Sequence, residues 1–196
     1  KKDKVSYNIG STKLTIAYSN NFKPYHFAIN IPCNQTNEAL KWLKDRINTL
    51  KCGEDDIQDF NTWNAKAMYF YDADQNILEF IARKNLKNES TQAFSTKSLL
   101  QISEIGVPVS TIEDVFNPLN EKFQINLYDG NLERFCAIGD ENGMFICLNK
   151  DVKKWFPTGD KAHSSNFKIK FKNKGNHYQL SFTDGRIKAT IDQNQF

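Results

Sequence analysis

The sequence predicts an α+β fold built from two βαβββ-like modules, and two observations support this. The first is an internal repeat: "YFYDADQNILEFI" (residues 69–81) and "CAIGDENGMFICL" (residues 136–148) both read as strand, Asp/Asn/Gly turn, strand. The second is that a strand pattern and then a helical pattern precede each copy. We therefore expect curved mixed sheets that form a half-open barrel, with the helices outside.

The first module opens with a strand and a helix. Residues 25–32, "YHFAINIP", alternate, so that Phe27, Ile29 and Ile31 share one strand face and His26, Ala28 and Asn30 share the other. Apolar residues then recur at helical spacing over residues 36–50, which predicts a helix packed on the face that carries Phe27. A hairpin over residues 5–18, closed at Gly10-Ser11, precedes this module.

The second module follows a polar stretch. Residues 99–109 read as a strand and residues 111–123 as a helix, in which Pro118 is expected to break or restart the helix. A second Asp-Gly turn, at Asp184-Gly185, predicts a β meander near the end of the chain. The expected organisation is a first region over residues 1–86 (hairpin and first module), a linker over 87–97, a second module over 98–157 and a meander over 158–196.

Composition excludes several classes of function. The chain has 196 residues, of which 39% are hydrophobic, and a formal net charge of +3 spread along its length, so neither nucleic acid nor a membrane surface is indicated as a partner. No apolar run is long enough for a transmembrane helix, and no signal peptide is visible. The four cysteines lack metal-type CxxC spacing, which favours reduced structural thiols in a cytoplasmic protein.

A carboxylate interrupts the most apolar strand. Glu79 shares a strand face with Ile77 and Ile81, while Leu78 and Phe80 occupy the opposite face, so both faces are apolar and Glu79 is expected to be at least partly buried. A buried carboxylate is costly unless it is paired or binds a metal. The alternative is a Glu79 that faces solvent on a one-sided sheet.

At these residues the sequence resembles the vicinal oxygen chelate superfamily, which includes glyoxalase I, extradiol ring-cleavage dioxygenases and bleomycin-resistance proteins. The resemblance rests on "YHFAINIP", "ALKWLKDR", "WNAKAMYFYDADQNILEFIAR", "ISEIGVPV" and "FCAIGDENGMFI", and covers roughly residues 5–157. The family's usual turn before a ligand Glu is Asp-Pro-Asp-Gly-Asn, and Ala73 and Gln75 replace its Pro and Gly here.

The resemblance implies a divalent metal held by the first-strand and last-strand residues of a module. In the first module these positions are His26 and Glu79, and in the second they are Glu104 and Ile146, of which only Glu104 can bind a metal. Imidazole and carboxylate ligands suit Fe(II), Mn, Zn or Ni. We expect His26 and Glu79 to converge within about 5 Å, given metal–ligand bonds of about 2.0–2.3 Å.

The rest of the ligand set stays open at this point. The hairpin over residues 5–18 looks like the tail of a preceding module, with Thr15 at its Glu position, and the strand and helix that should come before it are absent from the chain. The missing ligand either lies in that absent strand and helix or does not exist. His163 and His177 are the other histidines, and isolated histidines more often have structural or solvated roles.

Aromatic residues near Glu79 suggest how a substrate would be handled. Tyr69 and Tyr71 alternate on one strand face beside Glu79, and the three are the catalytic candidates. The two tyrosines either orient a substrate or act as acid or base, or they pack in the core with the hydroxyl at the rim. Trp63 either closes over a pocket or plugs the core. Trp155-Phe156-Pro157 forms a binding lip or covers the second module.

Two functions fit these residues. The first is a metal-dependent lyase, isomerase or dioxygenase that acts on a small oxygenated substrate in the barrel cavity, with the metal polarising two neighbouring oxygens. The second is a metal-free, bleomycin-resistance-like protein that sequesters a small molecule. We favour the enzyme because His26 and Glu79 pair. The incomplete edges of both modules also predict a homodimer.

Overall fold

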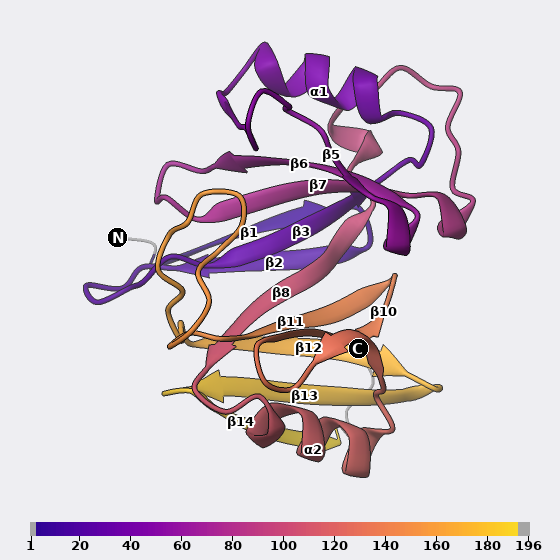
Figure 1. The fold of residues 1–196 in the computed structure, drawn as a ribbon. Helices are drawn as coiled ribbons and strands as arrows, with labels where there is room; N and C mark the ends of the chain where they lie inside the picture. Colours follow the sequence, from indigo (N-terminus) through magenta and orange to yellow (C-terminus); the bar gives the residue numbers. More distant parts are fainter. Residues whose placement is uncertain (1–2, 192–196) are drawn as a thin grey trace. The chain divides into compact units, whose positions relative to one another are not determined.

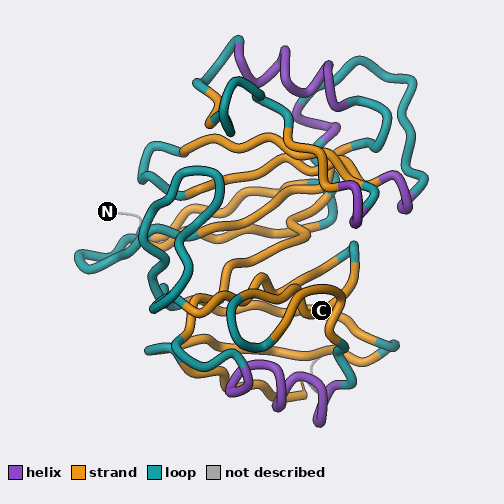
Figure 2. The backbone as a smooth tube through the Cα atoms, in the orientation of Figure 1, coloured by secondary structure: helices purple, strands orange, loops and turns teal. Residues whose placement is uncertain are grey.

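The computed structural model describes residues 3–191 and divides into two compact units (Figure 1). Within the described residues, unit 1 holds residues 3–105, 141–143 and 156–159, and unit 2 holds residues 106–140, 144–155 and 160–191. Figure 2 shows that each unit combines several strands with an α-helix. No helix among the described residues is both long and apolar enough to span a membrane.

Unit 1 is a mixed sheet with one helix on one face. Its elements are β1 (Lys4–Ile9), β2 (Thr12–Ala17), β3 (His26–Ile31), α1 (Thr36–Lys44), β4 (Thr49–Leu50), β5 (Gln58–Phe60), β6 (Ala65–Tyr71), β7 (Ile77–Arg83) and the first part of β8 (Gln101–Val109). The strands follow the order β4-β6-β7-β3-β8, with β5 also beside β6, and β1 and β2 form a separate hairpin. The β3–β7 pair is parallel, whereas β6–β7 and β3–β8 are antiparallel.

One face of this sheet packs on the helix, and the other carries the candidate site. Ile29, Ile31, Met68, Phe70 and Phe80 pack with Ala39 and Leu43 of α1, which lies along the strands in Figure 1. The face that carries Phe27 therefore packs on the helix, as the alternation predicts. The opposite face carries His26, Ala28 and Asn30 and is left for the candidate site.

Helix α1 is shorter than the predicted helix over residues 36–50. It ends at Lys44, and Thr49 and Leu50 instead form β4, where they pair with Phe70 and Tyr69. Long-range pairing with β6 overrides the helical spacing of Ile47 and Leu50. Similarly, the expected linker is a docked segment: Asn88 accepts from the backbone N–H of Cys33, and Phe94 packs against Trp42.

Unit 2 repeats the helix-on-sheet plan. Its elements are the second part of β8, α2 (Glu113–Phe123), β9 (Leu127–Asn131), β10 (Phe135–Asp140), β11 (Gly143–Asn149), β12 (Phe167–Asn173), β13 (Asn176–Thr183) and β14 (Arg186–Ile191). The order is β8-β11-β10-β9, and β12-β13-β14 form an antiparallel three-stranded sheet. Tyr178, Leu180 and Phe182 are buried on one face of that sheet.

The prediction that Pro118 breaks or restarts a helix is wrong. Pro118 lies inside α2, which runs without interruption from Glu113 to Phe123. Proline removes one backbone hydrogen bond there, while Val115, Leu119 and Phe123 stay buried along one side of the helix. Packing of that side therefore outweighs the missing bond. The α+β class with a mixed sheet is confirmed, and the sheet is open rather than closed into a barrel.

Candidate metal centre

Three neighbouring strands bring His26, Glu79 and Glu104 together in unit 1. Ala28 of β3 lies opposite Glu79 on β7 and opposite Glu104 on β8, so this alanine stands between the two carboxylates. His26 lies two residues before Ala28 and on the same face of the strand. Because Ala28 has only a methyl side chain, the two glutamates and the histidine can converge above it.

A bulge in β8 aims Glu104 at this point. The β3–β8 register shifts between Ala28 and Ile29, which pair with Glu104 and Ile102, so Ser103 is an extra residue in the strand. Such bulges redirect side chains and are common beside functional sites. Regular alternation through Ser103, without the bulge, would instead place Glu104 on the same face as Ile102, which is the helix-covered face.

The Asp/Asn turn of the first repeat positions the histidine. The Asp72 carboxylate accepts from the backbone N–H of Asp74 and of Asn76, and Gln75 takes a left-handed conformation with φ of 62°. The Asn76 side-chain oxygen then accepts from the backbone N–H of Tyr25. This turn therefore locks the start of β7 to the start of β3, directly beside His26.

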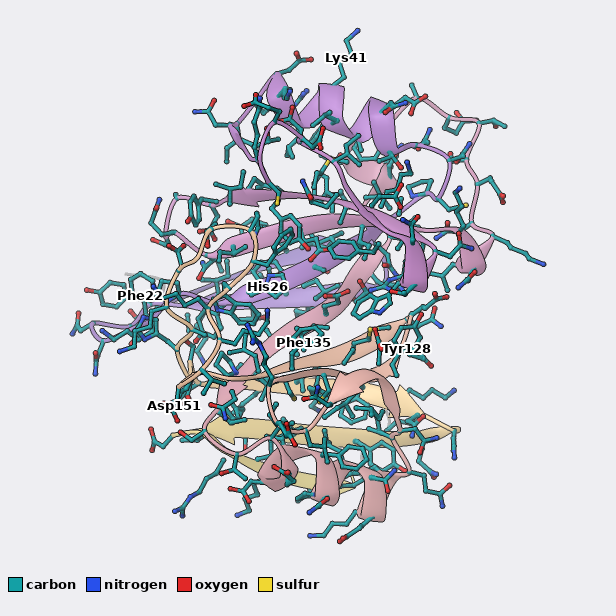
Figure 3. All side chains as sticks on the ribbon, viewed as in Figure 1. Phe22, His26, Lys41, Tyr128, Phe135 and Asp151 are labelled. Carbon is teal, nitrogen blue, oxygen red and sulfur yellow. The ribbon has the colours of Figure 1, made fainter. Side chains whose placement is uncertain are left out.

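The three side chains form one compact, buried cluster. Nε2 of His26 lies 3.7 Å from Glu79 Oε2 and 3.9 Å from Glu104 Oε2. One candidate ligand atom from each residue lies within 4.8 Å of the others. Exposure is 5% for His26, 3% for Glu79 and 4% for Glu104. The predicted burial of Glu79 and its convergence with His26 on one face are both confirmed (His26 is labelled in Figure 3).

Burial keeps His26 neutral. Desolvation lowers its pKa to about 4, against a smaller raising effect of the hydrogen bond with Ile77. Nδ1 lies 3.1 Å from the Ile77 carbonyl oxygen, so Nδ1 carries the proton and donates it. Nε2 is then the nitrogen with a lone pair, and it faces the two carboxylates. A histidine held by its second nitrogen in this way is typical of metal ligands.

Arg83 is a fourth member that the sequence reasoning missed. Its side chain is fully buried, and its guanidinium NH2 donates to Glu104 Oε1, which leaves Oε2 directed at His26. The ring of Trp63 lies 5.4 Å from the guanidinium carbon. The alternation of β7 could have found this residue, because Ile77, Glu79, Ile81 and Arg83 share one face.

The carboxyl groups hold protons more tightly than ordinary glutamates. Burial and the neighbouring Glu104 raise the pKa of Glu79 well above its usual value, while Arg83 and a hydrogen bond from Tyr69 oppose this. Burial also raises the pKa of Glu104, against the effect of Arg83. Burial first, and then both glutamates, raise the pKa of the Tyr69 hydroxyl well above its usual value, so Tyr69 acts as a donor.

The cluster fits a divalent cation. Two atoms that are each about 2.1 Å from one ion can lie at most about 4.2 Å apart, and the two measured distances from His26 Nε2 satisfy this limit. One neutral imidazole and two carboxylates also supply the donor types that Fe(II), Mn, Zn and Ni accept. With both carboxylates ionised, Arg83 offsets only one negative charge, so a cation or a proton is needed for the other.

The remaining predicted residues lie elsewhere. Tyr71 is half-buried at the end of β6, on the face of Tyr69. Thr15 is exposed and hydrogen-bonds to Ser6 across the hairpin. Among the described residues, the metal-type cluster does not include His163 or His177, which belong to unit 2. The four cysteines, Cys33, Cys52, Cys136 and Cys147, are free thiols.

The two aromatic segments flanking the site behave differently. Trp63 is half-buried, and its ring lies against the guanidinium group of Arg83. This position matches neither a residue that closes freely over a pocket nor one that fills the core. Trp155 is buried, whereas Phe156 is 40% exposed and places its ring 5.7 Å from that of Tyr69 in an edge-to-face contact. Residues 156–159 belong to unit 1, so Phe156 lies beside the cluster.

Comparison with solved structures identifies the fold. The chain resembles a "putative dioxygenase" from Bacillus subtilis with a TM-score of 0.54 and 11% sequence identity, over 92% of this chain and 67% of that one. A V278E mutant of glyoxalase I from Zea mays matches with a TM-score of 0.46 and 12% identity, over 92% of this chain and 73% of that one. No family model and no curated protein matches the sequence. The chain therefore shares the overall fold of the Bacillus subtilis protein.

Proposed function

We propose that His26, Glu79 and Glu104 bind one divalent metal ion, and that the protein is a metal-dependent enzyme acting on a small oxygenated compound. One observation carries the proposal: three strands direct one ligand atom each to a single buried point, with all three atoms within 4.8 Å. The family resemblance of the sequence and the geometry of the strands both select these residues.

Each residue has a distinct role in this proposal. His26 offers Nε2, and its Nδ1 bond to Ile77 fixes the ring. Glu79 and Glu104 supply negative charge, and Arg83 orients Glu104 so that Oε2 faces the centre. Tyr69, hydrogen-bonded to Glu79, is placed to donate a proton or to orient a substrate oxygen. A bound divalent ion would act as a Lewis acid on the substrate's oxygens.

The test is metal binding with a matched pair of variants. Protein purified without chelators or nickel resin is analysed for metal, and then titrated with Mn, Fe(II), Zn or Ni while thermal melting is followed. Glu79→Gln keeps the side-chain shape but loses the charge, so it should abolish the metal-dependent rise in Tm. Glu38→Gln, on the exposed side of α1, is the control and should behave as the wild type. Equal melting curves with and without metal would overturn the proposal.

One observation favours the metal-free alternative. Arg83 already places a buried cation against Glu104, and a proton on Glu79 would then neutralise the cluster without a metal. In that case the protein would sequester a small molecule through Tyr69, Trp63 and their neighbours. Absence of metal in the purified protein, together with a raised Tm in Glu79→Gln, would select this function.

The homodimer and the cytoplasmic location stay predictions. In unit 1, β3 and β8 pair with each other, so these two strands leave no open edge between them. The hairpin β1–β2 forms a separate two-stranded sheet, with Val5, Tyr7 and Ile16 exposed, and it is the surface of unit 1 that we propose for pairing. Light scattering at high micromolar concentration would contradict the dimer if it showed only monomer.

A further inference from the structure

A closed circle of side-chain contacts starts and ends at the cluster and includes one solvent-exposed residue. The ring of His26 lies 6.4 Å from Tyr69, and that of Tyr69 lies 5.7 Å from Phe156. Phe156 lies 6.3 Å from Phe60, which lies 6.2 Å from Trp63. Trp63 covers Arg83, and Arg83 bonds Glu104, beside His26 again. All of these residues belong to unit 1.

Exposure rises along this circle and peaks at one residue. The polar members and Tyr69 are at most 5% exposed, Phe60 and Trp63 are half-buried, and Phe156 is 40% exposed. A ligand that reaches His26 must therefore displace a covering side chain. Phe156 has the least burial to lose, so it is the side chain of the circle that moves at the lowest cost.

The backbone around Phe156 suits such movement. The N–H of Trp155 bonds the carbonyl of Asp160, which ties the two ends of a short loop together while Trp155 stays buried. Inside that loop, Gly159 has a φ of 74° and the Phe156 side chain leaves the loop toward Tyr69 and Phe60. The loop is thus closed at its ends, and two edge-to-face ring contacts of Phe156 join it to Tyr69 and Phe60.

We propose that Phe156 controls entry to the cluster. The rings of Phe60, Trp63, Phe156 and Tyr69 form the uncharged part of the circle, and Phe156 is the most exposed of them. A movement of this one ring opens the circle next to Tyr69, which contacts His26. This role does not rest on the proposed function.

Entry is tested by a reaction that needs no metal. Diethyl pyrocarbonate acylates accessible histidines, and peptide mass spectrometry reports the rate at each one. Phe156→Ala removes two aromatic contacts, each of about 0.5–1.5 kcal/mol, so acylation of His26 should speed up about tenfold. Phe156→Tyr keeps the ring and should leave the rate near that of the wild type. His163 and His177 should react at unchanged rates in every variant and serve as internal controls.

A matched surface variant and a melting curve exclude trivial causes. Val152→Ala also removes an exposed apolar side chain, 61% exposed, from the second half of the chain, and it should not change acylation of His26. Phe156→Ala should lower Tm only slightly. A rate at His26 in folded Phe156→Ala that equals the wild-type rate overturns the entry proposal, whether or not the protein binds metal.

Discussion

The two modules share a backbone plan but differ in what they bury beside the sheet. In the first, β3 and β7 carry His26, Glu79 and Arg83 on the face opposite α1. In the second, the position that matches Glu79 is Ile146, and its neighbours on the same face of β11 are Met144 and Leu148, all buried. The strand, turn and strand of the repeat are kept in both, so the repeat specifies the backbone and not the chemistry.

The difference teaches where the site can be built. Glu104 belongs by sequence to the first strand of the second module, yet it lies in unit 1, because β8 pairs with β3 over residues 101–105. The second module thus contributes one carboxylate to the cluster of the first and keeps an apolar face for its own core. One polar cluster per pair of modules limits the cost of burying charge.

The largest effect is expected when the second module receives a carboxylate at the position that matches Glu79. Ile146 is 4% exposed, and Lys150, at the position that matches Arg83, bonds the hydroxyl of Ser164. Ile146→Glu should therefore lower the free energy of unfolding by about 3–5 kcal/mol, measured by urea denaturation. Leu127→Glu, at a 39%-exposed position on β9, should change it by no more than about 0.5 kcal/mol. Similar losses in the two variants would refute the idea that the second module excludes charge.

Removing the buried cation from the first module should have the next largest effect. Arg83→Met leaves Glu104 without its guanidinium partner, so the free energy of unfolding at pH 7 should fall by about 3 kcal/mol. Adding Glu104→Gln should restore part of that loss, because the unpaired charge is then gone. Lys84→Met, at the exposed neighbouring position, is the control. A loss in the double variant equal to the sum of the two single losses would show that Arg83 and Glu104 are not coupled.

The pH dependence of stability sharpens the role of Glu79. Its pKa in the folded protein is raised, so without metal the folded state binds more protons and stability falls as pH rises from about 4.3 through the raised pKa. The lowered pKa of His26 acts in the opposite direction between about 4 and 6.5. Above about pH 6.5 the His26 contribution no longer changes. Stability should then fall with pH for as long as the glutamates release protons, by up to about 1.4 kcal/mol per pH unit for each.

Glu79→Gln separates that contribution from the rest. In the variant, the fall in metal-free stability above about pH 6.5 should be smaller, because only Glu104 still titrates with a raised pKa. Thermal melts at intervals from pH 5 to pH 9 with a chelator present measure this. Identical pH profiles in variant and wild type would mean that Glu79 stays ionised throughout.

The smallest expected effect concerns the tyrosine that bonds Glu79. Tyr69→Phe removes one buried hydrogen bond and should cost about 1 kcal/mol of unfolding free energy. Since that bond lowers the pKa of Glu79, its loss raises the pKa further, and half-maximal metal uptake should move to higher pH. Metal titration across pH checks this shift. An unchanged uptake profile would place the Tyr69 hydroxyl outside the chemistry of the site.

Much of the site was predictable from local pattern. Alternation in residues 25–32 and 77–83 assigns His26 and Glu79 to one face, and the Asp72–Asn76 turn that aligns them is visible in the repeat. Arg83 could have been predicted in the same way, because it lies on the same strand face as Glu79. It was missed because a cation at the end of a strand resembles an ordinary surface charge. Its complete burial is a property of the packed sheet and not of the strand.

The sequence by itself determined the periodic features: the strands that carry His26 and Glu79, the face that each of these side chains takes, and the two occurrences of the strand–turn–strand phrase. These depend on neighbours within a few residues, where the backbone geometry is fixed. Only the tertiary structure decided three features. These are the length of α1, the bulge at Ser103 that turns Glu104 toward His26, and the ring contact of Phe156 with Tyr69. Each of these depends on pairing between residues far apart in the chain, whose register and burial are set by the packed sheet as a whole.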